Sequence, residues 1–210
     1  QLLETRPALA HLALLLLFLG FATKSGILPM GSWLPDAYPA APSGATAFFG
    51  GAMGKLGVYG LLRAFLVFLP LSSATVVWGW IIAAAGLGSL VVGTLMALKQ
   101  DDVKRLMSFH AIGQMGYMFL AIGFGMVLLA TDPFLAALGL LGGIFHVLNN
   151  ALYKSGLFLT AAAVEYRTGE RSLAALPGGL GAFMAVTAGC AVVASLAIAG
   201  VPPLNGFSSK

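Results

Sequence analysis

Charge and cysteine are both scarce in this sequence. Only 9% of the 210 residues are charged, against about 25% in a typical soluble domain. The single cysteine, Cys190, excludes a disulfide within the chain, and no cysteine or histidine cluster forms a metal or redox motif. The basic residues do not cluster beyond Lys104-Arg105, so the net charge of +4 does not indicate nucleic-acid binding. These shortages argue against a soluble domain and against a nucleic-acid partner.

Catalytic motifs are missing too. The sequence has no phosphate-binding glycine loop, no nucleophile paired with a base and no ligand set for a metal. We therefore predict a non-catalytic chain that holds no cofactor of its own.

Apolar residues make up the sequence instead. They account for 59% of it, the mean hydropathy is +0.95, and apolar runs of about 20 residues, enough to cross a bilayer, recur along its length. We predict an all-α integral membrane protein with about six transmembrane helices, at residues 7–30, 45–68, 75–98, 106–130, 133–164 and 181–201. We expect residues 1–210 to form a single domain that is an internal piece of a longer subunit.

The loops predict an orientation. Alternating spans place one set of basic residues on the same side of the membrane: Lys99, Lys104, Arg105, Arg167 and Arg171. The other side has only Arg6, with Arg63 near that end of its helix. By the positive-inside rule the first side is cytoplasmic and residue 1 lies outside. The acidic residues are all expected in loops or termini: Glu4, Asp36, Asp101, Asp102, Asp132, Glu165 and Glu170.

Several basic side chains lie within the apolar segments. They are Lys24, Lys55, Lys154, His110 and His146. An ionised lysine at the centre of a spanning helix costs roughly 2.5–3.5 kcal/mol, so such residues usually mark an ion or proton pathway. Snorkelling to the headgroups is the other explanation. It accounts for Arg63, stays open for Lys24, and fits poorly with the long apolar flanks of Lys55 and Lys154. His110 fits either explanation, and His11 is expected at a membrane boundary.

The stretch FHVLNNALYKSGLFL, residues 145–159, carries the most informative spacing. His146, Asn150 and Lys154 are four residues apart, so they drift only about 40° per step and share one helical face over about 12 Å. Buried lysine and histidine can both gain and lose protons near neutral pH. Bridged by water and Asn150, they form a plausible proton relay.

Two segments contain helix breakers next to lysine. Gly26 and Pro29 follow Lys24, and Pro202, Pro203 and Gly206 precede Lys210. Each break could simply end a spanning helix. Paired Gly/Pro breaks in a membrane protein also mark ion sites, because freed backbone groups survive only beside protein or water. We therefore predict two interrupted helices that carry Lys24 and Lys210.

Several motifs together resemble a known family. The chain is similar to the antiporter-like subunits shared by respiratory complex I, Mrp-type Na⁺/H⁺ antiporters and membrane-bound group 4 hydrogenases. The stretches that carry the resemblance are KSGILPMGSWLPDAYPAAPS, GKLGVYGLLR, DDVKRLMSFHAIGQMGYMFLAIG, FHVLNNALYKSGLFL and GVPPLNGF. Their order and spacing agree over essentially the whole chain.

The resemblance implies a fold and a role for each residue. It implies part of an inverted-repeat transporter fold, with Lys24 as the central lysine of the first half-channel and Lys55 on the next helix. His146 and Lys154 would link the two half-channels, and Lys210 would end the second. The family often has histidine where this sequence has Asn150. A glutamate that pairs with Lys24 is expected upstream of this chain.

The implied function is translocation of protons or other cations, in a subunit of a redox-driven complex. The implied location is an energy-transducing membrane, such as a prokaryotic plasma membrane. The implied partners are other membrane subunits and the lipid bilayer, and the implied transported ion is H⁺ or Na⁺. Two alternatives stay open: an Mrp-type Na⁺/H⁺ antiporter subunit without redox partners, and a membrane scaffold that does not transport.

Overall fold

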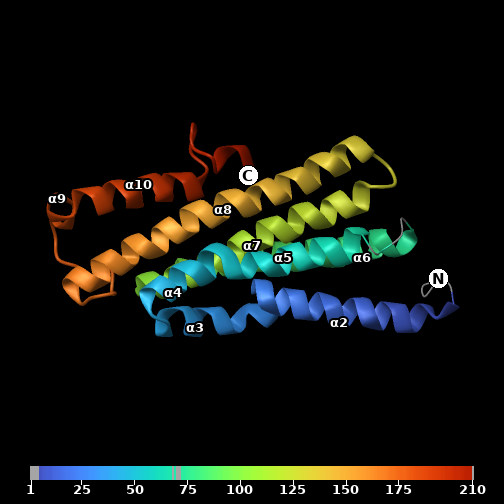
Figure 1. Cartoon of the computed structure of the whole chain (residues 1–210), viewed down its shortest axis with the longest axis horizontal. Helices are drawn as coiled ribbons and strands as arrows, with labels where there is room; N and C mark the ends of the chain where they lie inside the picture. The colour runs from blue at the N-terminus through green and yellow to red at the C-terminus, as the bar shows by residue number, and fades with distance from the viewer. Residues whose placement is uncertain (1–4, 68, 70–71, 210) are drawn as a thin grey trace.

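The computed structural model of the chain describes residues 5–67, 69 and 72–209. Figure 1 shows long helices lying side by side along the longest axis of the molecule. Three of them are α6 (Ser73–Ala97), α7 (Val103–Leu128) and α8 (Pro133–Thr168). These helices and the stretch Pro7–Ala40 are long and apolar enough to cross a membrane. The predicted all-α membrane fold is confirmed.

The first predicted segment is an interrupted helix. Helix α2 (Pro7–Ser25) ends at Gly26, whose φ of 81° is left-handed and suits glycine. The chain resumes as the 3-10 turn η1 (Met30–Trp33) and helix α3 (Leu34–Ala40). This stretch falls between the first two predicted segments, residues 7–30 and 45–68, yet much of it is helical, because Pro35 lies in the first turn of α3, where its missing N–H is not needed.

The second segment is helical but irregular. Helices α4 (Ser43–Phe48) and α5 (Gly54–Leu62) alternate with the π-helical turns η2 (Phe49–Met53) and η3 (Arg63–Val67). In the sixth segment, α9 (Leu180–Phe183) and α10 (Ala185–Ala199) are followed by the short turn η4 (Phe207–Ser209). Among the described residues, four stretches reach the length of a membrane span. The predicted number of six is therefore not established.

Helices α6 and α7 approach very closely through glycines. A Cβ atom placed on Gly86 would lie 2.5 Å from the backbone nitrogen of Leu120 and 2.8 Å from the carbonyl oxygen of Gly116. Gly79 and Gly93, one heptad away on either side, face the α7 backbone in the same way. Small residues are the usual means by which membrane helices pack. Helix α8 packs against the α7 member of this close pair (Figure 1).

The loops at one end of the bundle are held together by charge. Lys104 pairs with Glu165, Arg105 with Asp36, and Arg171 with Asp102. The loop before α7 also pairs with the loop after α8 through the backbone of Asp102 and Ser172. Lys104, Arg105 and Arg171, three of the five basic residues predicted to lie on one side, therefore share one end. The prediction for Asp36 and Glu165 was wrong, because they lie within α3 and in the last turn of α8.

Candidate functional site

The polar stripe of α8 is buried inside the bundle. His146 and Asn150 are 1% exposed, and Lys154 is 0% exposed. The spacing predicted from the sequence therefore places all three side chains on the covered face of α8, against α7 and neighbouring segments. They are polar groups in an apolar environment, so each needs a hydrogen-bond partner.

Lys154 finds its partner on the backbone of α7. Its Nζ donates to the carbonyl oxygen of Met107 at 2.7 Å, and it lies 5.5 Å from the centre of the Phe158 ring. Among the ion pairs of the described residues, none involves Lys154. A carbonyl and an aromatic face stabilise an ammonium without neutralising it.

Lys55 is held in the same manner. It is 7% exposed and is the second residue of α5, just after the π-helical turn η2, where its Nζ donates to the carbonyl oxygen of Gly50. Turns of this kind occur frequently at functional sites. Lys55 and Lys154 lie close enough for their charges to interact. The structure thus brings together two lysines that are about 100 residues apart in the sequence.

His146 lies at the centre of a hydrogen-bonded group. Its Nε2 lies 3.1 Å from Oε1 of Gln114, and its Nδ1 lies 3.1 Å from Oγ of Ser209. The Tyr153 hydroxyl donates to the same Gln114 oxygen at 3.1 Å and accepts a hydrogen bond from Asn150 Nδ2 at 3.3 Å. All but Ser209 are almost fully buried.

Two members of this group, Gln114 and Tyr153, were not predicted from the sequence. Gln114 is uncharged and Tyr153 is normally neutral, so neither is marked by a charge within an apolar run. A signal was available: Gln114 is a polar residue within the apolar run of α7, four residues after His110 and so on the same helical face. His110 itself is half-buried on α7.

The second break brings the end of the chain onto α8. Helix α10 ends at Gly200, whose φ is 80°, and the chain then folds back. Asn149 and Asn205 exchange hydrogen bonds, with Asn149 Nδ2 donating to the Asn205 carbonyl at 2.9 Å and Asn205 Nδ2 donating to Asn149 Oδ1 at 3.2 Å. This places Ser209 on His146. Lys210, the predicted site residue that follows, lies outside the described residues.

The first break is also stabilised by polar contacts. The freed backbone N–H of Leu28 donates to Oγ of the buried Ser89 on α6 at 3.0 Å, and the Trp33 indole donates to the carbonyl of Thr23 at 3.1 Å. Such satisfaction of freed backbone groups is what a break within a membrane requires. Lys24, in the last turn before this break, is exposed on the surface of the chain. The structure does not bring it into the buried group.

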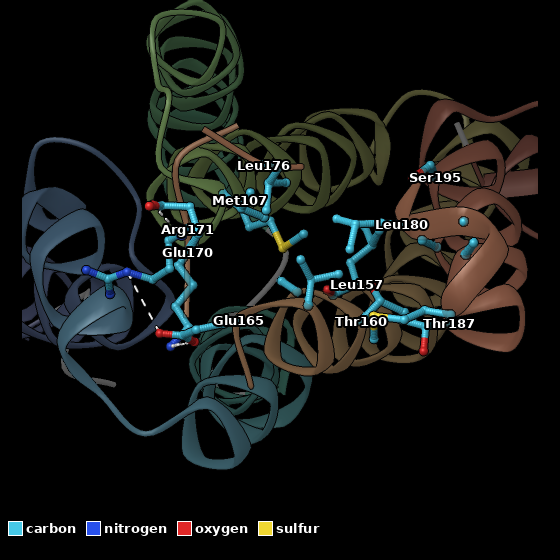
Figure 2. A pocket seen from close by; sticks show the side chains of 18 residues that line it. Met107, Leu157, Thr160, Glu165, Glu170, Arg171, Leu176, Leu180, Thr187 and Ser195 are labelled. Carbon is cyan, nitrogen blue, oxygen red and sulfur yellow. Dashed lines mark hydrogen bonds and ion pairs between the residues drawn. The ribbon is translucent and has the colours of Figure 1, made fainter. Parts of the chain in front are cut away.

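A cavity of about 210 Å³ lies between α7, α8 and α10, close to the charged end. Figure 2 shows the charged side chains Glu165, Glu170 and Arg171 on one side of it and apolar residues, including Met107 and Leu157, on the other. Met107 supplies the carbonyl that binds Lys154. The cavity therefore extends from the charged end to the residue whose carbonyl binds Lys154.

The charged rim is well ordered by hydrogen bonds. Lys104 Nζ lies 2.7 Å from Glu165 Oε2, and Ser43 donates to the same oxygen at 2.9 Å. The half-buried Glu170 accepts from the backbone N–H groups of Ser172 and Arg171, which lowers the pKa of its carboxyl group. Among the described residues, no group of three or more His, Cys, Asp or Glu could hold a metal ion.

Solved structures of related proteins share this fold. The chain superimposes on a chain of the Mrp complex from Dietzia sp. DQ12-45-1b with a TM-score of 0.82 and 27% identity, covering 99% of this chain and 36% of that one. It superimposes on a chain of the membrane-bound sulfane sulfur reductase (MBS), an archaeal respiratory membrane complex, with a TM-score of 0.83 and 29% identity, covering 99% and 40%.

Sequence comparison agrees with these superpositions. Hydrogenase-4 component B of Escherichia coli (strain K12) is 41% identical over 209 residues, which cover 99% of this chain and 31% of that protein. The chain thus spans about a third of the length of this relative. Residues 5–210 match the family described as "NADH:quinone oxidoreductase/Mrp antiporter, TM". This chain belongs to that family of antiporter-like membrane subunits.

Proposed function

We propose that this chain carries protons, or alkali cations, along a buried line of lysine and histidine side chains, within a membrane subunit of a multi-subunit redox complex. The main support for this proposal is the environment of Lys154. This lysine is fully buried in an apolar bundle, and its ammonium group is bound by the Met107 carbonyl. Burial of an ionisable group at this cost is typical of a transport pathway.

The neighbours of Lys154 suit a proton pathway that continues on both sides of this residue. Toward α5 lies Lys55, whose charge interacts with that of Lys154. Along α8 lies the group around His146, which reaches Ser209 at the second break. A proton that arrives on one lysine disfavours a positive charge on the next, so occupancy can pass along the line as alternating protonation.

The cavity at the charged end offers access to this line. It runs from Glu165, Lys104 and Arg171 to Met107, the residue whose carbonyl binds Lys154. Water in this space would connect the pathway with the charged side of the membrane. We propose that this side is cytoplasmic, because it holds most of the basic loop residues.

Lys24 and Lys210 are proposed as the ends of the pathway. The exposed side chain of Lys24 is available to a partner outside these 210 residues. Such a partner, which we propose to be a carboxylate, would compensate its charge. Because the chain spans about a third of its relative, we treat it as one translocation domain of a longer subunit that lies among other membrane subunits.

An Mrp-type cation/proton antiporter is the second candidate. The similarity to a chain of the Mrp complex, with a TM-score of 0.82, favours it. The two functions differ in their partners. Iron–sulfur or hydrogenase-like subunits that copurify with the full-length protein would support the redox complex, whereas copurification with small membrane proteins alone would support the antiporter.

Transport in sealed vesicles tests the proposal. The full-length subunit in its complex would be compared with Lys154→Ala, and with Lys99→Ala as the control, because Lys99 is exposed at the end of α6. We expect Lys154→Ala to abolish ion movement and Lys99→Ala to leave it unchanged, with equal assembly of both. Undiminished transport by an assembled Lys154→Ala complex would favour a scaffold role instead.

A further inference from the structure

The pathway around His146 has a gap that its ionisable residues do not fill. His146 and Lys154 are eight residues apart, about two turns or 12 Å along α8. Between them lies Asn150, whose amide can donate and accept hydrogen bonds but does not take up a proton near neutral pH. A proton that crosses this distance needs a group that can accept one proton and release another.

The Tyr153 hydroxyl has this ability and lies beside the His146 ring and Asn150. It is 4% exposed, its oxygen lies 3.5 Å from His146 Nε2, and it accepts a hydrogen bond from Asn150 Nδ2. Its own proton is directed to Oε1 of Gln114. A hydroxyl is both donor and acceptor, so it can receive a proton on one side and release one on the other without a net change of charge.

The hydrogen bonds around His146 assign a separate role to each ring nitrogen. Gln114 Oε1 is only an acceptor, so His146 carries a hydrogen on Nε2 in its neutral form. Its Nδ1 then accepts from the Ser209 hydroxyl. The incoming side of His146 is therefore Nδ1, which faces the second break, and the outgoing side is Nε2, which faces Gln114 and Tyr153.

Ser209 has an alternative acceptor for its hydroxyl hydrogen. Its Oγ lies 3.4 Å from the carbonyl oxygen of Gly206. When a proton binds Nδ1 of His146, that nitrogen becomes a donor. The Ser209 hydroxyl can then donate to the Gly206 carbonyl and accept from the Nδ1–H of His146. Both protonation states of His146 are thus satisfied by the same residues, with a single hydroxyl rotation between them.

We propose that Tyr153 is a proton-carrying residue of this pathway and that Gln114 positions it against His146. A proton binds Nδ1 of His146. In one concerted step the Nε2 proton passes to the Tyr153 oxygen as the original hydroxyl proton leaves through water to Lys154, whose own proton has already moved on toward Lys55, so that no protonated phenol forms. His146 is left neutral with its hydrogen on Nδ1, and a half-turn of the ring returns that hydrogen to the Nε2 position before the next proton arrives. This inference rests on the proposed function, because it describes one step of the same path.

Packing alone is the competing role for Tyr153. Its ring belongs to a small apolar cluster with Leu157, Ala194 and Ala197, which joins α8 to α10. Tyr153→Phe separates the two roles, because it keeps the ring and removes only the hydroxyl. A second substitution, Asn150→His, puts a proton-carrying side chain on the buried stripe, one turn from both His146 and Lys154.

The experiment uses the full-length subunit in its complex, in sealed vesicles, with assembly checked by the amount of copurified subunits. We expect Tyr153→Phe to slow proton transport on the order of 100-fold, the lower end of what a positioned proton-transfer group contributes. We expect the double variant Asn150→His/Tyr153→Phe to recover most of that loss. The solvent deuterium isotope effect on transport should rise in Tyr153→Phe, because proton transfer then limits the rate.

Two outcomes would overturn the inference. One is a Tyr153→Phe complex that transports at the original rate while Lys154→Ala does not, which leaves the proposed function intact. The other is a slow Tyr153→Phe complex with an unchanged isotope effect and no recovery by Asn150→His, which assigns Tyr153 to packing. Unchanged transport by Lys154→Ala would instead contradict the proposed function itself.

Discussion

Lys104 and Glu165 form an ion pair of 2.7 Å between the first turn of α7 and the last turn of α8. The side chain of Lys104 is 4% exposed and that of Glu165 is 29% exposed. The pair lies at the rim of the cavity that leads to Met107. It therefore ties two helices together at the point where water would enter.

Breaking this pair from the Glu165 side should destabilise the complex. Glu165→Gln leaves the Lys104 ammonium buried without its carboxylate, which costs about 1–3 kcal/mol for an unsatisfied buried group. Lys104→Met/Glu165→Gln removes the charge as well and should recover part of the loss. Thermal midpoints of the purified complexes, arranged as a double-mutant cycle, measure the coupling. If the losses of the single variants Lys104→Met and Glu165→Gln add up to the loss of the double variant, the pair does not couple the helices.

Lys55 should be required for transport, whereas Arg63 on the same segment should not. Lys55 is buried and held by the Gly50 carbonyl, and Arg63, two turns later, is exposed. We expect Lys55→Ala to reduce ion movement in vesicles at least about ten-fold, which corresponds to about 1.4 kcal/mol. Arg63→Ala is the matched control, because it removes a positive charge from the same helical stretch. Equal effects of the two substitutions would contradict a specific role for Lys55.

The glycine contact between α6 and α7 should be sensitive to any side chain. A leucine at position 86 would collide with the α7 backbone at Leu120 and Gly116. Overpacking of this kind typically costs about 1–3 kcal/mol. We expect Gly86→Leu to lower the thermal midpoint of the complex and the yield of assembled subunit. Gly88→Leu, in the same helix, has no atom within 4 Å of the added Cβ and should leave both unchanged.

The arrangement along α8 was predictable because it is local. Four-residue spacing fixes a helical face, so His146, Asn150 and Lys154 had to share one, and the apolar flanks indicated that this face was buried. Both helix breaks were predictable for the same reason, because Gly26 and Pro202 change the conformation of the backbone at their own positions. The position of Lys104, Arg105 and Arg171 at one end of the bundle was also predictable, because alternating spans leave no other arrangement.

The partners across helices were not predictable from spacing. Gln114 meets His146 only because α7 packs beside α8 in one register, and a single sequence does not state that register. The exposure of Lys24 was missed for a similar reason, since a lysine in an apolar run has the same sequence context whether its helix face is covered or not. The helical conformation of α3 also depends on where its prolines fall within the turn.

The hydrogen bond from Lys154 to the carbonyl of Met107 has a consequence for variation at position 107. Every amino acid has a carbonyl oxygen, so any side chain that lets α7 keep its path supplies the same acceptor to the ammonium group. Relatives with different residues at this position can therefore share the contact, and comparing their side chains would not reveal it. The acceptor also has no proton of its own to exchange, so it is the same at every pH at which the fold persists. The acceptor for the buried lysine therefore depends on the backbone path of α7 and not on the side chain at position 107.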